Sequence, residues 1–164
     1  MIETRQTNFT KDSVNKKIIV EREFDAPLAQ VWRAWTEAEL LDQWWAPRPW
    51  KTRTRSMDFR EGGVWLYYME GPEGEKQLCR VDYATIRPEQ SFTGDDAFCD
   101  EAGNINRDFP VMHWQCHFSG TSSGTLVRVE ITFDSEADME KIIEMGFQEG
   151  FTAAHGNLDE LLAR

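Results

Sequence analysis

The hydrophobic positions along this chain follow two different periods, and each period predicts one type of secondary structure. Residues 16–24 read KKIIVEREF, and Ile18, Val20 and Phe24 fall on one side of an extended chain. Arg22 interrupts that apolar side. An alternation of period two is typical of a strand that buries one face. We expect further strands within the stretches 50–59, 60–86 and 111–133.

Short glycine-containing turns divide these alternating stretches into hairpins. GPEG at 71–74 and SGTSSG at 119–124 each lie between two alternating runs. Such turns predict antiparallel pairing of the strands that they join. The segment 101–110 has no such pattern and is expected to be a loop.

A helical period replaces the alternation in the segment 25–45. Its apolar residues recur at roughly helical spacing, Asp25 is a candidate cap, and Pro27 suits the first turn. We expect two short helices that bend near Thr36, the second of them ended by Pro47.

Residues 135–164 predict one long C-terminal helix that Ser135 caps. Gly146 and Gly150 fall on its apolar stripe, although each glycine costs a helix about 1 kcal/mol relative to alanine. Because the two glycines lack side chains, they leave space beside the helix, and such a helix is useful in a protein that needs a pocket there. The other stripe residues are Met139, Ile143, Phe147, Ala154, Leu158 and Leu161.

The order of these elements predicts an α+β fold. One strand, two short helices and about six antiparallel strands precede the long helix, which must cover one face of the sheet. We expect a single domain over 16–164. The polar segment 1–15 is either a loose tail or an extension of the sheet edge.

Composition narrows the class of protein. The formal net charge of −11 disfavours binding to nucleic acids and to anionic membrane surfaces. We find no apolar run near the roughly 20 residues that span a bilayer and no secretory signal, so no membrane insertion is expected. An odd number of scattered cysteines (Cys79, Cys99 and Cys116) fits reduced thiols. A cytoplasmic protein is the expectation.

The expected inner face of the sheet is rich in large side chains, and it must meet the thinned helix. Either the rings fill the space beside Gly146 and Gly150, or an apolar pocket of a few hundred cubic ångströms remains. If the pocket exists, we expect its wall to include Trp65, Tyr67, Met69, Cys79, Val81, Met112, Trp114, Cys116, Ile143, Gly146, Phe147, Gly150 and Phe151.

Three tryptophans and two prolines stand close together in WWAPRPW, where the second short helix ends. We expect one indole of the pair Trp44 and Trp45 to anchor the bend in the core, and the other to form a wall of the pocket. The alternative is that both rings simply plug the open end of the fold.

Three motifs carry a resemblance to a known family. REFDAPLAQVWRAWTEAELLDQWWAP, MDFREGGVWLYYMEGPEG and EMGFQEGFTAAHGNLDELLA resemble the bacterial relatives of the activator of the heat-shock-protein-90 ATPase, within the START-like (SRPBCC) superfamily. The resemblance covers about 18–163 and implies a helix-grip fold like that of Bet v-type proteins. In that fold a curved antiparallel sheet of six to seven strands surrounds a long C-terminal helix, with a deep cavity between them.

The resemblance also implies the classes of function to weigh. Members of the superfamily bind lipids, sterols, polyketides or plant hormones, and a few are cyclases or hydrolases. Our first hypothesis is therefore binding of a small hydrophobic molecule without a cofactor. An enzyme using His155 or Tyr67 for acid–base chemistry is the second, and a chaperone-associated interaction module is the third. The sequence leaves a homodimer open.

Metal binding is not expected. His113 and His117 lie about 13 Å apart on an extended strand, and Cys116 points to the opposite face. The acidic run at 95–103 lacks the spacing of a calcium loop, so we interpret it as a solvated loop.

Overall fold

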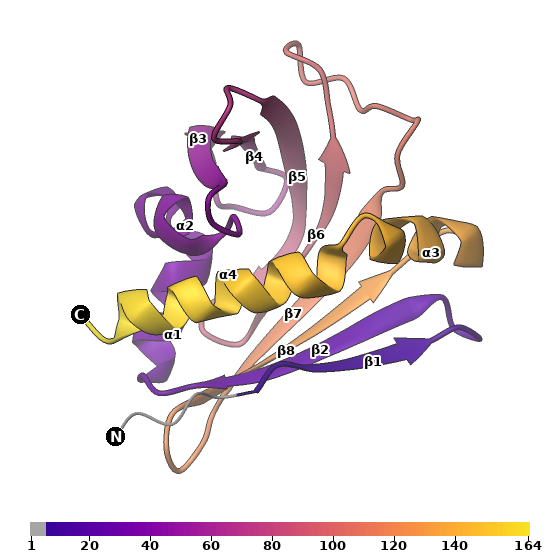
Figure 1. Cartoon of the computed structure of the whole chain (residues 1–164). Coiled ribbons are helices and arrows are strands. Elements are labelled where there is room, and N and C mark those ends of the chain that lie inside the picture. The colour runs from indigo at the N-terminus through magenta and orange to yellow at the C-terminus, as the bar shows by residue number, and fades with distance from the viewer. Residues whose placement is uncertain (1–5) are drawn as a thin grey trace.

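The computed structural model describes residues 6–164, in which one antiparallel sheet curves around a C-terminal helix (Figure 1). Within these residues the sheet has eight strands in the order β1-β2-β8-β7-β6-β5-β4-β3. The strands are β1 (Asn8–Asp12), β2 (Lys17–Phe24), β3 (Lys51–Met57), β4 (Val64–Glu70), β5 (Lys76–Arg87), β6 (Ser91–Phe98), β7 (Met112–Gly120) and β8 (Thr125–Thr132). The helices of the same residues are α1 (Leu28–Thr36), α2 (Ala38–Trp44), α3 (Glu136–Glu144) and α4 (Phe147–Leu162). This is the predicted α+β class.

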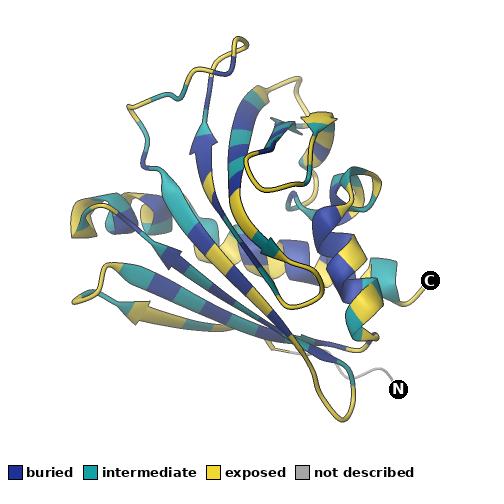
Figure 2. Ribbon diagram, turned by 180° about the vertical axis from the view of Figure 1, so that it is seen from behind, coloured by how far each residue is buried: buried dark blue, intermediate teal, exposed yellow. Residues whose placement is uncertain are grey.

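Alternating side chains give the sheet one buried face and one exposed face. In β2 every second residue is buried, Arg22 included, and β8 repeats the pattern. From behind, the strands show these alternating bands of buried and less buried residues (Figure 2). The predicted strand over 16–24 and both predicted hairpins are confirmed.

The sheet begins earlier than residue 16. Asn8–Asp12 pairs antiparallel with β2, so of the two alternatives for the N-terminal segment the edge extension is the one formed. The ring of Phe9 packs edge-on against Phe147, 6.4 Å between ring centroids. This edge strand and the acidic β6 bring the sheet to eight strands, more than the expected six to seven. Residues 1–5 of the expected tail lie outside the described residues.

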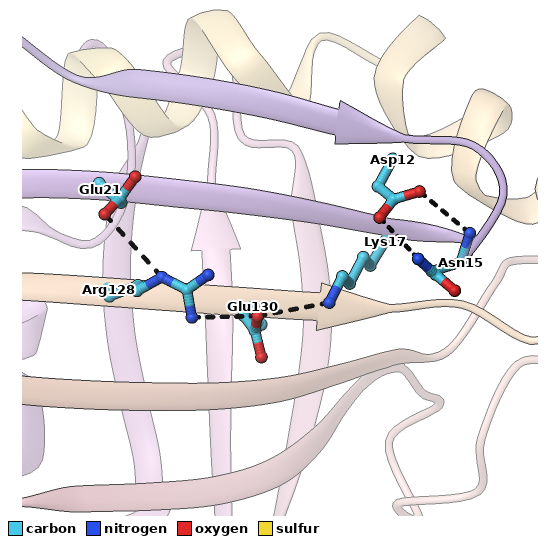
Figure 3. A network of polar contacts seen from close by, with 6 residues as sticks. All are labelled: Asp12, Asn15, Lys17, Glu21, Arg128 and Glu130. Carbon is cyan, nitrogen blue, oxygen red and sulfur yellow. Dashed lines mark hydrogen bonds and ion pairs between the residues drawn. The ribbon is translucent and has the colours of Figure 1, made fainter.

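Charged side chains cover the outer face near this edge (Figure 3). Arg128 on β8 lies between Glu21 of β2, at 3.9 Å, and Glu130, at 3.0 Å. Lys17 reaches Glu130 from the other side at 3.5 Å. Half-exposed pairs of this kind contribute little stability each, about 0–1 kcal/mol. They mark this face as the solvated one, and the apolar face of the sheet is the opposite one.

The segment between β2 and β3 forms two short helices that bend at Glu37, next to the predicted Thr36. Pro27 itself occupies the N-cap of α1 without a side-chain cap bond, so the prediction that Asp25 caps this helix was wrong. The indole of Trp44 donates a 2.8 Å hydrogen bond to the carbonyl of Ala34. That bond joins the end of α2 to α1 and fixes the bend.

The predicted single C-terminal helix is two helices, α3 and α4. Ser135 caps α3 as expected, because its Oγ accepts from the backbone N–H of Asp138 at 3.0 Å. The chain then turns at Gly146, whose φ of +90° lies in the left-handed region that favours glycine. This residue ends one helix and precedes the other, so it does more than remove a side chain from a continuous stripe. No helix in the described part of the chain is long and apolar enough to cross a membrane.

Candidate ligand-binding site

A cavity of about 470 Å³ lies between α4, the α3–α4 turn and the inner face of the sheet. Most of its lining is apolar, and its polar groups include the side chains of Gln77 and Asp96 and the hydroxyl of Tyr67. The complete lining comprises Trp45, Pro47, Trp50, Tyr67, Met69, Gln77, Cys79, Asp96, Ala97, Phe98, Phe109, Pro110, Met112, Trp114, Ile142, Met145, Gly146, Phe147, Gly150 and Phe151. The volume falls within the roughly 300–1,000 Å³ typical of small-molecule sites.

Gly150 contributes space to this wall. A Cβ built there would lie 3.7 Å from Cγ of Pro47, which is ordinary van der Waals contact. Backbone crowding therefore does not require glycine at this position. The missing side chain leaves room on the cavity side of α4, in line with the purpose inferred from the sequence.

The two neighbouring tryptophans have different surroundings. Trp44 is 1% exposed and does not line this cavity, whereas Trp45 forms part of its wall. The Trp45 ring packs against Trp65 and Trp114, each 5.7 Å between centroids, and against Phe151 at 6.1 Å. A separate void of only about 20 Å³ lies behind these rings. The rings thus fill the space near α1 and α2, and the open cavity lies toward the α3–α4 turn.

Most of the predicted pocket residues meet in one place. Those that line the large cavity are Trp45, Tyr67, Met69, Cys79, Met112, Trp114, Gly146, Phe147, Gly150 and Phe151. Trp65, Val81 and Cys116 line only the small void behind the rings. The structure places Trp44 and Ile143 at neither.

The cavity wall contains Ile142 at the place where the sequence predicts Ile143. A continuous helix would have put Ile143 on one face with Phe147. The left-handed residue Gly146 changes the phase between α3 and α4, so that Ile142 turns inward instead.

Asp96 is the functional candidate that the sequence analysis missed. It lies on strand β6 and is buried, so the prediction that the acidic run forms a solvated loop is wrong for this residue. The side chain is 6% exposed and lines both the cavity and the small void. Alternation alone could have found it, because Phe92, Gly94 and Asp96 share the inner face of one strand.

The Asp96 carboxylate shares the cavity wall with two other titratable groups. The Tyr67 hydroxyl donates to its two oxygens over long distances of 3.5 and 3.4 Å. Burial raises the pKa of Asp96 from 3.8 to about 7, and the bond from Tyr67 only partly opposes that rise. Burial, followed by the charge of Asp96, holds the pKa values of Tyr67 and Cys79 well above their usual ranges. At neutral pH the tyrosine and the thiol are therefore uncharged.

His155, the candidate catalytic base, does not reach the cavity. It is 1% exposed and packs against Phe151, 4.2 Å between centroids, and Phe24 at 5.5 Å. Its Nδ1 lies 2.9 Å from the hydroxyl of Thr7. Burial and then the nearby Arg22 lower the pKa of His155 to about 3. This neutral imidazole is a packed core residue, which removes the basis for its role in acid–base chemistry.

The histidines of β7 lie on the outer face, away from Cys116. His113 contacts Asp95 at 2.7 Å and Asp134 at 2.9 Å. Burial lowers its pKa, but these two carboxylates outweigh that effect and raise it. Within residues 6–164 the structure contains no group of three or more His, Cys, Asp or Glu side chains that could hold a metal ion.

Comparisons with known proteins agree with this architecture. The sequence profile of the family described as "Activator of Hsp90 ATPase homolog 1-like protein" matches residues 25–163. The chain is 28% identical to protein Ms6760 from Mycobacterium smegmatis, with a TM-score of 0.88 over 97% of each chain. It is 31% identical to an Arthrobacter aurescens protein, with a TM-score of 0.90 over 95% of this chain and 91% of that chain.

A more distant structure shares the fold alone. The AHSA1 protein from Silicibacter pomeroyi is 18% identical, with a TM-score of 0.71 over 90% of this chain and 97% of that chain. No curated protein matches this chain. The predicted helix-grip fold is confirmed by these likenesses.

Proposed function

This chain belongs to the family of Activator of Hsp90 ATPase homolog 1-like proteins, and from that premise we propose that it binds a small hydrophobic molecule. The observation that carries the proposal is the cavity of about 470 Å³ between α4 and the sheet. Protein interiors normally close to crystal-like density, so an apolar space of this size is unusual in a domain with no use for it.

The lining residues favour a flat or flexible apolar ligand. Trp45, Trp114 and Phe151 offer ring faces and edges, which contribute large contact areas at small entropic cost. Met69 and Met112 add unbranched side chains that adapt to irregular shapes.

The test uses a matched pair of substitutions on α4. Gly150→Leu adds a side chain at the cavity wall, whereas Gly156→Leu adds the same side chain where nothing lies within 4 Å. We expect ethylnaphthalene, a neutral bicyclic probe, to bind the wild type and Gly156→Leu with equal affinity. Gly150→Leu should bind it at least about tenfold more weakly, as followed by isothermal titration calorimetry.

Two outcomes would count against the proposal. Equal affinity in all three proteins would place the probe outside the cavity. Native mass spectrometry and a thermal-shift screen that detect no hydrophobic ligand at all would remove the functional claim itself.

The two alternative functions have less support. An enzyme that uses His155 loses its base, since that imidazole is buried away from the cavity. A co-chaperone role rests on the family description, whereas the cavity is a property of this chain. We also expect a cytoplasmic location, because Cys79, Cys99 and Cys116 are all unpaired and buried.

A further inference from the structure

Asp96 stands out among the groups that line the cavity. On β6 it pairs with Val81 of β5 and Met112 of β7, so it lies in the middle of the sheet and its side chain rises from the inner face. A carboxyl group in such a position loses nearly all contact with water, since only 6% of the residue is exposed. Burying a charge without a partner is among the largest penalties in a protein interior.

The protein supplies little to offset this penalty. In residues 6–164 the Tyr67 hydroxyl is the side-chain partner of the carboxylate, at 3.4 and 3.5 Å, well beyond the usual 2.7–2.8 Å of a strong O–H···O bond. Within the same residues, Asp96 forms no ion pair with a lysine, arginine or histidine. One strong interaction with the carboxylate is therefore missing.

The groups that face Asp96 from the neighbouring strands are all acids or apolar. From β4 comes Tyr67, from β5 come Cys79 and Tyr83, and Cys99 follows β6 itself. The side chains of β7 and α4 at the cavity, Met112 and Phe151 among them, carry no charge. Nothing in this set neutralises a carboxylate, and a ligand with its own negative charge would be repelled.

We propose that the ligand is an apolar, aromatic-sized organic cation, whose protonated amine binds the Asp96 carboxylate while its body lies against the rings of the cavity. This inference rests on the proposed function and specifies its ligand class. A protonated amine would provide the donor that the carboxylate lacks, and charge-assisted bonds of this kind are about twice as strong as neutral ones. Indole rings such as Trp45 also attract cations through their π faces.

Three probes of one size test this inference. Naphthylmethylamine carries the cation, ethylnaphthalene replaces the amino group by a methyl group, and naphthoate carries an anion. At pH 8 we expect wild-type protein to bind the amine about tenfold or more tightly than ethylnaphthalene, and naphthoate most weakly. Isothermal titration calorimetry measures all three affinities.

Two isosteric variants locate the preference. Asp96→Asn removes the charge and should bind the amine no more tightly than ethylnaphthalene. Asp95→Asn changes the next residue, which points outward to His113, and should keep the wild-type preference. Circular dichroism and thermal melting establish that both variants are folded.

A measurement on the wild type alone complements the variants. Lowering the pH from 8 to 5.5 protonates Asp96 but leaves the amine charged. The affinity for the amine should therefore fall to within about twofold of that for ethylnaphthalene, while the affinity for ethylnaphthalene stays constant. Tyr67, Cys79, Tyr83 and Cys99 stay neutral over this range, because their pKa values are raised above their ordinary values.

The outcomes separate the two proposals. Equal binding of amine and ethylnaphthalene by the wild type overturns the inference about the ligand class and leaves the cavity proposal standing. The same holds if Asp96→Asn keeps the preference for the amine. If none of the three probes binds, the proposed function fails and the inference fails with it.

Discussion

Replacing Asp96 by asparagine should stabilise the protein at alkaline pH, even though it removes a residue of the proposed site. Burial raises the pKa of Asp96 from 3.8 to about 7 in the folded protein. Between these two values the folded state binds a proton that the unfolded chain has lost. The free energy of unfolding of the wild type therefore falls as the pH rises from about 4 to 7, and this contribution stays constant above 7.

The size of the effect follows from the two pKa values. Each unit of difference between them corresponds to about 1.4 kcal/mol, so ionised Asp96 costs on the order of 4 kcal/mol above pH 7. Asparagine has nearly the same shape and no charge. We expect Asp96→Asn to exceed the wild type in stability by about 2–4 kcal/mol at pH 8, the lower end allowing for an imperfectly bonded amide.

Urea denaturation at pH 4, 6 and 8 measures this difference directly. The comparison of variant with wild type isolates Asp96 from other titrating groups, including His155, whose lowered pKa acts in the opposite direction. We expect the stability gain to vanish near pH 4. A gain that is the same at all three pH values, or a loss at pH 8, would refute the claim that Asp96 is a buried acid without a charge partner.

Two further pairs of substitutions test the structure of α4. Gly146→Ala should destabilise the protein by about 1–2 kcal/mol in urea denaturation, because a φ of +90° strains any residue with a Cβ. The control Gly156→Ala should be neutral or slightly stabilising. Equal changes in stability in these two variants would contradict the break between α3 and α4 at Gly146. Asp159→Asn should cost about 2–3 kcal/mol of stability, because it leaves the guanidinium of Arg22, which is 3% exposed, without its carboxylate partner. Glu160→Gln, which breaks the exposed pair with Arg48, should cost less than about 1 kcal/mol in urea denaturation. A similar loss of stability in Asp159→Asn and Glu160→Gln would argue against a buried ion pair.

The pattern of the sequence was sufficient to predict much of the fold. Strict alternation over Lys17–Phe24 and Thr125–Thr132 places apolar side chains on one face, and no other structure buries them as well. The turns GPEG and SGTSSG then set the antiparallel pairing. Edge strand β1 gave no such signal, since Asn8–Asp12 buries none of its residues fully and is held largely by backbone bonds to β2.

The candidate site was predicted less completely, and single residues explain why. Apolar periodicity indicates which positions face inward, so part of the cavity wall was found, including Trp114, Met69 and Met112. The rings of Trp50, Phe98 and Phe109 and the side chain of Met145 were not predicted. Asp96 was missed because the acidic run that contains it was interpreted as a loop, although its spacing from Phe92 places it on the inner face of a strand. The periodicity of a helix also continues formally through Gly146, so the change of phase that turns Ile142 inward was missed.

The most direct test of the cavity is a titration of isotopically labelled protein with naphthylmethylamine, followed by proton–nitrogen NMR. We predict that the signals that shift belong to the Trp45 indole and to the backbone amides of Gly146 and Gly150, while the amide of Gly156 on the outer side of α4 stays unchanged. Binding that leaves the first three signals in place, or that shifts Gly156 instead, would contradict a ligand site between α4 and the sheet.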